Sequence, residues 1–337
     1  MQLIEHLDQQ TRTIVEMGYR EALERPVTLR ANTLKATVDD VCPTVDDVCR
    51  DLNARDIVYE RVPWYDDALV VRDARERDLW ELDIYREGHI YLQSLSSMLP
   101  PLLLEPRAGA DILDMCAAPG GKTAQIAALT GNAAHLTACE MSAPRAEKLA
   151  YNLDKLGAAN VNVMRTDARK LDEFFSFDQI LLDAPCTGTG TYRAGDERAE
   201  KRMTPQLLAK VTKSQRALLD RALTVLKPGG TLVYSTCSVL AEENDDQVRA
   251  ALKRHRDCEV APILLDAPTE MEADDQPERP RAAKDEVRPA ILANAGSGPL
   301  RCPALERECA LAGTLTVAPT RLFEGFYVAV IRKKART

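Results

Sequence analysis

The chain has 337 residues, a formal net charge of −8 and 45% hydrophobic residues, which predicts a packed globular protein and excludes an intrinsically disordered one. Its acidic balance argues against simple non-specific binding of nucleic acid. No apolar run is long enough to span a membrane, and the N-terminus lacks the pattern of a secretory signal or a transit peptide.

The first hundred residues predict a helix followed by a small mixed domain. Residues 1–24 carry apolar side chains at helical spacing. After Pro26, the stretches "VTLRANTL" and "ALVVRD" predict strands, and "VDDVCRDLNARD" predicts a helix. We therefore expect residues 1–105 to form an N-terminal helix and an α+β accessory domain.

A short duplication lies within this region. The sequence TVDDVC occurs at 37–42 and again at 44–49, with Pro43 between the copies. Two copies are too few for a solenoid. We interpret them as a duplicated helix start, since proline is tolerated in the first turn of a helix.

From residue 110 onward, short apolar runs alternate with amphipathic stretches. This alternation predicts parallel strands joined by helical crossovers, so the expected class is α/β with a doubly wound, mostly parallel sheet. Residues 264–320 are rich in proline, alanine and charge and predict a loop-like insertion in this second domain, residues 106–337. The strand segments are "ADILDMC", "AHLTACE", "NVNVMRTD", "FDQILLDA", "GTLVYSTC" and "FYVAVIRK".

Reactive and charged residues follow the predicted strands. In open α/β sheets, ligands bind beyond the carboxyl ends of the strands. Residues that end separate strands are therefore expected to meet at one site. They are Cys116, Glu140, Asp167, Asp183 with Cys186, and Cys237.

The first of these strands leads into a loop of small residues, "DMCAAPGGKT" at 114–123. Its glycines allow a ligand to approach the backbone. The spacing fits neither the phosphate-binding loop of nucleotide hydrolases nor the dinucleotide fingerprint. Glu140 at the next strand end could accept from both ribose hydroxyls, and Asp167 could accept from an adenine amino group. This set favours an adenosine cofactor such as S-adenosylmethionine, with NAD as an alternative.

Nine cysteines are scattered along the chain without a C-x-x-C pair. The odd number and the spacing argue against a disulfide framework and a zinc ribbon, so we expect no metal site and a reducing, cytoplasmic compartment. An isolated cysteine is by default a small buried apolar residue. This interpretation covers Cys42, Cys49, Cys139, Cys258, Cys302 and Cys309.

Three blocks together resemble the Sun/Fmu-type (NOL/NOP/sun) RNA cytosine-5 methyltransferases. They are "LDMCAAPGGKT", "DAPCTGTG" and "VYSTCS…EEN", and the upstream "LRANTLK" and "GHIYLQSLSSML" and the final "FEGFYVAVIRK" are also similar to that family. The resemblance covers about residues 26–260 and 321–334. Thr187 stands where the family often has serine, and both side chains provide a hydroxyl.

The resemblance implies a class I methyltransferase fold, S-adenosylmethionine as methyl donor and a cytosine of RNA as substrate. It implies that Cys237 is the nucleophile, that Cys186 helps to release the methylated RNA, and that Asp183 and Lys122 also take part in catalysis. Residues 1–105 are then expected to bind RNA. The implied cofactor contacts are Cys116, Ala117, Ala118, Pro119, Gly120, Gly121, Lys122, Glu140, Arg145, Asp167 and Asp183.

Covalent catalysis gives a physical reason for the cysteines. Addition of a thiolate to carbon 6 of cytosine makes carbon 5 nucleophilic enough to attack a methyl sulfonium. A helix expected to begin near Ala241 would favour the thiolate of Cys237. Asp183 could hold the base through N3 and the exocyclic amine. Such a base must be unstacked, so we expect a single-stranded or extruded cytosine.

Residues 191–216 contain seven basic and three acidic residues directly after the Cys186 loop. They form either an RNA backbone contact, through Arg198, Lys201 and Arg202, or an ordinary solvated helix face.

The expected substrate is ribosomal RNA, with tRNA as the alternative, and the expected state is a monomer without DNA or membrane partners. Two other hypotheses remain. One is a DNA cytosine-5 methyltransferase with Cys186 as nucleophile, and the other is a non-catalytic RNA-binding assembly factor.

Overall fold

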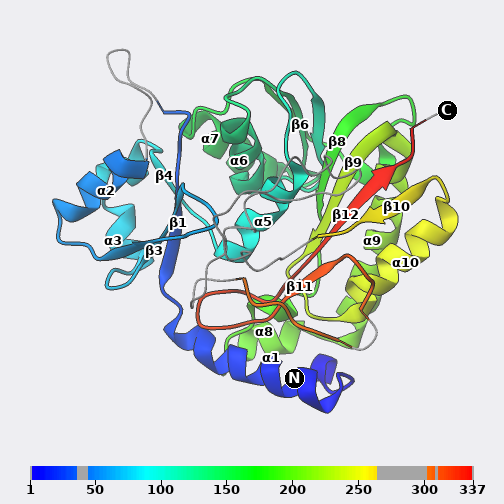
Figure 1. The fold of residues 1–337 in the computed structure, drawn as a ribbon, viewed down its shortest axis with the longest axis horizontal. Coiled ribbons are helices and arrows are strands. Elements are labelled where there is room, and N and C mark those ends of the chain that lie inside the picture. Colours follow the sequence, from blue (N-terminus) through cyan, green and yellow to red (C-terminus); the bar gives the residue numbers. More distant parts are fainter. Residues whose placement is uncertain (1, 36–44, 264–301, 308–309, 336–337) are drawn as a thin grey trace, which may run out of the picture.

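The computed structural model describes residues 2–35, 45–263, 302–307 and 310–335. Within them the chain forms a small four-stranded sheet and a large eight-stranded sheet with helices on both of its faces (Figure 1). In Figure 1 the small sheet lies to the left, and the large sheet crosses the middle and right of the molecule. The first copy of TVDDVC and most of the expected insertion lie outside the described residues.

The N-terminal segment differs from the expected continuous helix. Helix α1 spans Gln9–Glu21, flanked by the short 3-10 turns η1 (Gln2–Ile4) and η2 (Ala22–Glu24). The side chain of Asp8 accepts from the Thr11 amide at 2.8 Å and caps α1, so the helix begins there. The prediction of one helix over 1–24 was therefore wrong at both ends.

The small sheet is antiparallel, in the order β2 (Tyr59–Arg61), β3 (Ala68–Val71), β1 (Val27–Ala31), β4 (Ile90–Leu92). Apolar residues of its strands pack against three helices into a separate core. The second copy of TVDDVC contributes the start of the first of these helices. The helices are α2 (Val45–Asn53), α3 (Glu76–Trp80) and α4 (Asp83–Arg86).

The large sheet confirms the predicted α/β class with a mostly parallel sheet. Its order is β10-β12-β9-β8-β5-β6-β7, with β11 paired to β12. Strands β7, β6, β5, β8 and β9 are parallel, β12 runs antiparallel to β9, and β10 and β11 each pair antiparallel with β12. The bounds are β5 (Asp111–Asp114), β6 (His135–Cys139), β7 (Val161–Met164), β8 (Phe177–Asp183), β9 (Leu226–Thr236), β10 (Cys258–Ala261), β11 (Leu315–Val317) and β12 (Phe326–Lys333).

Successive strand residues enter cores on opposite faces of the large sheet, as the alternation of side chains requires. Ile112 and Leu181 pack in the core on the face of α5, whereas Leu113 and Leu182 pack in the core of α9 and α10. Strands such as β5 and β8 therefore carry consecutive apolar residues, because both faces of the sheet are covered. The helices that follow β5 are α6 (Gly121–Leu129), α7 (Ala143–Lys155), α8 (Glu197–Arg202), α9 (Pro205–Val225) and α10 (Asp245–Arg254), with the 3-10 turns η3 (Ala168–Lys170), η4 (Thr189–Thr191) and η5 (Ala241–Glu243).

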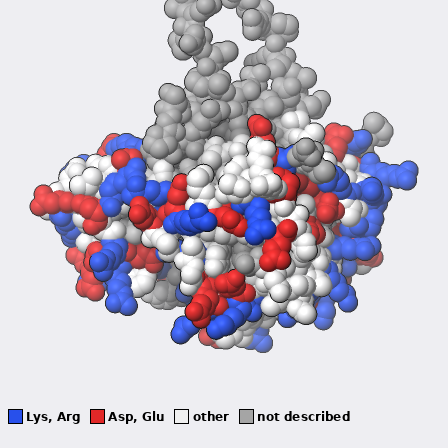
Figure 2. All heavy atoms as spheres, turned by 90° about the horizontal axis from the view of Figure 1, so that it is seen from below, with Lys and Arg blue, Asp and Glu red and all other residues white. Residues whose placement is uncertain are grey.

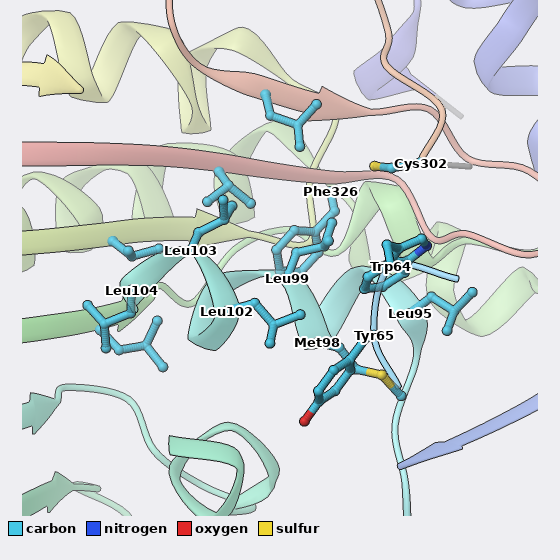
Figure 3. Close-up of a cluster of buried hydrophobic side chains, with 14 of the residues drawn as sticks. Trp64, Tyr65, Leu95, Met98, Leu99, Leu102, Leu103, Leu104, Cys302 and Phe326 are labelled. Carbon is cyan, nitrogen blue, oxygen red and sulfur yellow. The ribbon is translucent and has the colours of Figure 1, made fainter. Parts of the chain in front are cut away.

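Helix α5 (Leu95–Leu104) lies between the two sheets and packs its leucines into the core of the large sheet, beside Trp64 and Phe326 (Figure 3). It contains Pro100 and Pro101, which cannot donate to the helix ladder. The Ser97 carbonyl that Pro101 leaves free accepts from the Gln93 side chain at 3.1 Å. A polar contact from Gln93, directly after β4, thus compensates for a proline in this helix.

Two segments pack differently from the expected division of the chain. Side chains of α1 share a core with Tyr192, Leu240 and Ala318, so α1 lies against the large domain, below α8 in Figure 1. Strand β11 lies inside the segment 264–320, so the prediction of a loop was wrong for Leu315–Val317. The strand predicted at 326–333 is confirmed as β12.

Candidate active site

The two cysteines that end neighbouring strands lie side by side. Cys186 follows β8 and Cys237 follows β9, and these parallel strands are paired with Asp183 opposite Ser235. The sulfur atoms are 3.0 Å apart, within hydrogen-bond distance for a thiol and its partner. The hydrogen bond to Cys237, together with burial, raises the pKa of the Cys186 thiol well above its usual value.

Asp183, the last residue of β8, forms an ion pair beside the thiols. Its Oδ2 lies 2.8 Å from Nζ of Lys122, and its Oδ1 accepts from the Ser235 hydroxyl at 2.8 Å. Burial alone would lower the pKa of Lys122, but the charge of Asp183 and the hydrogen bond to it raise the pKa above its usual value. Lys122 is therefore a cation paired with the Asp183 carboxylate, and it lines the same cavity as Cys237.

The helix expected to begin near Ala241 begins at Asp245, and residues 241–243 form the 3-10 turn η5. The α-helix thus begins four residues later than the predicted Ala241, where only a 3-10 turn begins. The nearby positive charge comes instead from the side chain of Lys122.

A buried carboxylate that we did not predict holds both cysteine loops. Glu243 is fully buried and accepts from the Thr187 amide at 2.7 Å, next to Cys186. It also accepts from the hydroxyls of Thr187 and Ser238, the residue after Cys237. Burial raises the pKa of Glu243, and these hydrogen bonds offset part of that increase. The "EEN" block contains this residue, but only the folded chain brings it to the two loops.

Two glycines, also not predicted, bring a third segment against Cys237. The Gly190 amide donates to the Cys237 carbonyl at 3.0 Å, and the Gly325 amide donates to the Gly190 carbonyl at 2.8 Å. A Cβ atom on Gly190 would lie 1.8 Å from the Gly325 carbonyl oxygen. Only glycine permits this approach, which positions the start of β12 beside the thiols.

The small-residue loop 116–121 is held against α7. Arg145 donates to the Ala118 carbonyl at 2.9 Å and Asn152 donates to the Pro119 carbonyl at 2.7 Å. Gly120 has a φ of +109°, and α6 begins at the next residue. Beneath the loop, Asp114 accepts from the Thr123 hydroxyl at 2.7 Å, and burial raises its pKa to about 6.

Glu140 and Asp167 line one cavity of about 310 Å³, which we call the Glu140 cavity. Glu140 follows β6, is only 4% exposed, accepts from the Ser142 amide at 2.8 Å and pairs with Arg145 at 3.0 Å. Asp167 follows β7, and both of its oxygens accept from the Arg169 guanidinium, which lowers its pKa. The two strand-end carboxylates thus face the same space.

A second cavity of about 400 Å³, the Lys122 cavity, lies between the two sheets. It is lined by residues of β1, β4, the start of α5 and the start of β12, which sequence reasoning did not assign to the site. Four residues line both cavities: Cys116, Ala118, Asp183 and Cys237. The two spaces therefore meet at the strand ends that carry Asp183 and Cys237.

Substitution of Glu140 by alanine is expected to weaken the binding of an adenosine cofactor by about 1–3 kcal/mol, because the ribose hydroxyls would lose their acceptor. Isothermal titration with S-adenosylmethionine measures this change. The control is Glu147→Ala, which removes an exposed carboxylate from α7. Equal affinity in the two variants would exclude Glu140 from the cofactor site.

The predicted basic residues of 191–216 are only partly brought to these cavities. Arg193 lines the Lys122 cavity, whereas Arg198, Lys201 and Arg202 are exposed on α8. Lys201 pairs with Glu197 at 3.4 Å. Basic and acidic side chains are interspersed on the lower face of the molecule (Figure 2).

No helix among the described residues is long and apolar enough to cross a membrane.

Known proteins resemble the chain in sequence and in structure. It is 40% identical to ribosomal RNA small subunit methyltransferase F of Shewanella loihica, over 65% of this chain and 45% of that protein. It is 38% identical to 26S rRNA (cytosine-C(5))-methyltransferase nsun-1 of Caenorhabditis elegans, over 72% of this chain and 36% of that protein. A methyltransferase homolog from Pyrococcus horikoshii is 30% identical, with a TM-score of 0.67, over 96% of this chain and 90% of that one.

The chain thus spans less than half the length of these two curated relatives. The family model described as 16S rRNA methyltransferase RsmB/F matches residues 101–332. This match covers the large sheet, both cysteine loops and the loop 116–121. The chain belongs to the RsmB/F family of methyltransferases.

Proposed function

We propose that this chain methylates carbon 5 of a cytosine in RNA, with S-adenosylmethionine as donor and Cys237 as covalent nucleophile. The observation that carries the proposal is the pair of thiols, 3.0 Å apart, beside the Lys122–Asp183 ion pair. These groups lie where two cavities meet. One cavity can hold the methyl donor and the other the base.

The Glu140 cavity suits an adenosine cofactor. Glu140 supplies an acceptor for ribose hydroxyls, and an ionised Asp167 has lone pairs left beyond its bonds to Arg169. The loop around Cys116 and Ala118 separates this space from the Lys122 cavity. When bound, S-adenosylmethionine supplies an electrophilic methyl group. Glu140 would hold its ribose.

The roles of the catalytic residues follow from their positions. Cys237 adds to carbon 6, so that carbon 5 becomes the nucleophile that takes the methyl group. Asp183, held by Lys122 and Ser235, accepts from the exocyclic amine of the base. A solvent water accepts the carbon 5 proton, the electron pair of that C–H bond forms the double bond between carbon 5 and carbon 6, and Cys237 leaves as a thiolate. Cys186 lies in contact with the departing sulfur and helps that step.

Ribosomal RNA is the substrate that we propose. The family description and the names of both curated relatives refer to ribosomal RNA. A base can enter the Lys122 cavity only when it is unstacked, so the target is a single-stranded or extruded cytosine. The cytoplasmic location and the monomeric state remain predictions.

The non-catalytic alternative predicts a protein that does not bind S-adenosylmethionine productively. The buried bonds of Glu243 to both cysteine loops favour the enzyme, because an inert scaffold has no need to hold two thiols together. Bisulfite sequencing of cellular RNA with and without the gene tests the proposal. Loss of protection at one ribosomal cytosine is expected, and protection unchanged at every RNA cytosine would contradict it.

Joint substitution of Arg198, Lys201 and Arg202 by alanine is expected to weaken RNA binding. The slope of log affinity against log salt should fall by about one unit or less for each lost phosphate contact. Filter binding across a salt series measures both quantities. The control replaces three other basic residues by alanine: Arg249 and Lys253 on α10, and Arg256 just after it. An unchanged slope would identify α8 as an ordinary solvated face.

A further inference from the structure

The Lys122 cavity contains a carboxylate, Glu324, that the proposed mechanism does not use. It lies just before β12, its side chain is 23% exposed, and it lines the cavity together with Cys237. A carboxylate in a site proposed for RNA can accept hydrogen bonds from donors of the ligand. The donors that RNA offers are base amines and the 2′-hydroxyl of ribose.

Three side chains fix Glu324 in this position. Ser94 donates to its Oε2 at 2.7 Å, and Ser96 donates to its backbone carbonyl at 2.7 Å. The Arg25 guanidinium donates to the carbonyls of Thr320 and Phe323 and lies 3.8 Å from Oε1. A separation of 3.8 Å is too long for a hydrogen bond from Arg25, and no other donor to Oε1 is found in the part of the chain that the structure describes, so Oε1 retains capacity to accept from a ligand.

The backbone next to Glu324 is tied to the nucleophile. Gly325 donates to the Gly190 carbonyl at 2.8 Å, and Gly190 donates to the Cys237 carbonyl at 3.0 Å. In cytidine the ribose is attached to N1, the atom next to carbon 6, whereas the exocyclic amine lies across the ring. A base held at carbon 6 by Cys237 therefore brings its sugar, rather than its amine, toward the residues around Cys237.

We propose that Glu324 accepts a hydrogen bond from the 2′-hydroxyl of the target cytidine and so selects RNA over DNA. Arg25, Ser94 and Ser96 are positioning residues for this carboxylate. Asp183 serves the opposite edge of the base, and Glu324 serves the sugar. This inference rests on the proposed function, because it requires that Cys237 hold carbon 6 of cytosine.

The test uses the full chain and two synthetic RNA stem–loops that contain the cytosine mapped by bisulfite sequencing. They differ only in carrying cytidine or 2′-deoxycytidine at that position. The wild-type enzyme is expected to prefer the ribose substrate by roughly tenfold to a hundredfold in kcat/KM, the range for a hydrogen bond to a charged group. Glu324→Gln is expected to lose most of this preference, by slowing on the ribose substrate and changing little on the deoxy one.

The control variant is Glu76→Gln, which changes an exposed carboxylate of α3 that lines the same cavity. It should keep the ribose preference. A merely structural role of Glu324 would slow both substrates equally and leave their ratio unchanged, which would overturn the inference. Equal rates of the wild-type enzyme on both substrates would overturn it too, while the proposed function would stand. Failure to methylate either RNA would instead contradict the proposed function.

Discussion

Replacement of Cys237 by alanine is expected to abolish both methyl transfer and any covalent RNA adduct. No other nucleophile is proposed for carbon 6, so the barrier reverts to that of the non-covalent reaction. Replacement of Cys186 should have a different result. Cys186→Ala retains Cys237, forms the adduct and fails to resolve it. A protein–RNA species that survives a denaturing gel should accumulate in Cys186→Ala alone.

This pair of variants also separates the two nucleophile hypotheses. A DNA-type mechanism, with Cys186 as nucleophile, predicts that the adduct accumulates in Cys237→Ala and is absent from Cys186→Ala. The raised pKa of Cys186 and its contact with Cys237 support the assignment of Cys186 to release. The useful control is Cys139→Ala, since Cys139 is buried in β6 and lines the Glu140 cavity. It should form no trapped species. Retained methyl transfer in both Cys237→Ala and Cys186→Ala would exclude covalent catalysis.

Gly190→Ala is expected to eliminate activity without touching a reactive group. The new Cβ would lie 1.8 Å from the Gly325 carbonyl oxygen, so η4 and the start of β12 must separate. Overpacking of this kind costs about 1–3 kcal/mol or more, and here the movement displaces the carbonyl of Cys237. The thermal unfolding temperature and the rate of methyl transfer should both fall, whereas the affinity for S-adenosylmethionine should change little, because the ligands proposed for its adenosine, Glu140 and Asp167, follow other strands.

Gly195→Ala provides the comparison for this variant. A Cβ at Gly195 meets no atom within 4 Å, although its φ of +86° disfavours other residues. That substitution should cost about 1–2 kcal/mol of backbone strain and leave the rate constant of methyl transfer close to that of the wild type. Wild-type activity in Gly190→Ala would show that the contact with Gly325 does not position Cys237.

Local sequence patterns predict the large sheet well, because apolar runs and crossover helices are near neighbours along the chain. The same patterns predict which residues end the strands, and parallel strands bring those ends to one edge of the sheet. Asp183 and Cys237 could therefore be placed in one site from the sequence. The distance between the two sulfurs could not, since it depends on the register of β8 and β9 and on the loops after them.

Long-range contacts account for most of what the sequence did not predict. Glu243, Gly190 and Glu324 act through partners that only the folded chain brings together, and no periodicity marks them. The start of α1 is a different case. Asp8 is a recognisable N-cap residue, and the helical spacing of Leu3 and Leu7 obscured it. The start of α10 was predicted too early, because sequence patterns poorly distinguish a preceding 3-10 turn from an α-helix.

The most direct test of the account is the identity of the methylated nucleoside. The purified protein is incubated with ribosomal RNA that lacks the modification and with S-adenosylmethionine carrying a deuterated methyl group. The RNA is then digested to nucleosides for mass spectrometry. The account predicts label in 5-methylcytidine for the wild-type chain and none for Cys237→Ala. Label in any other nucleoside, or label in 5-methylcytidine that persists in Cys237→Ala, would contradict it.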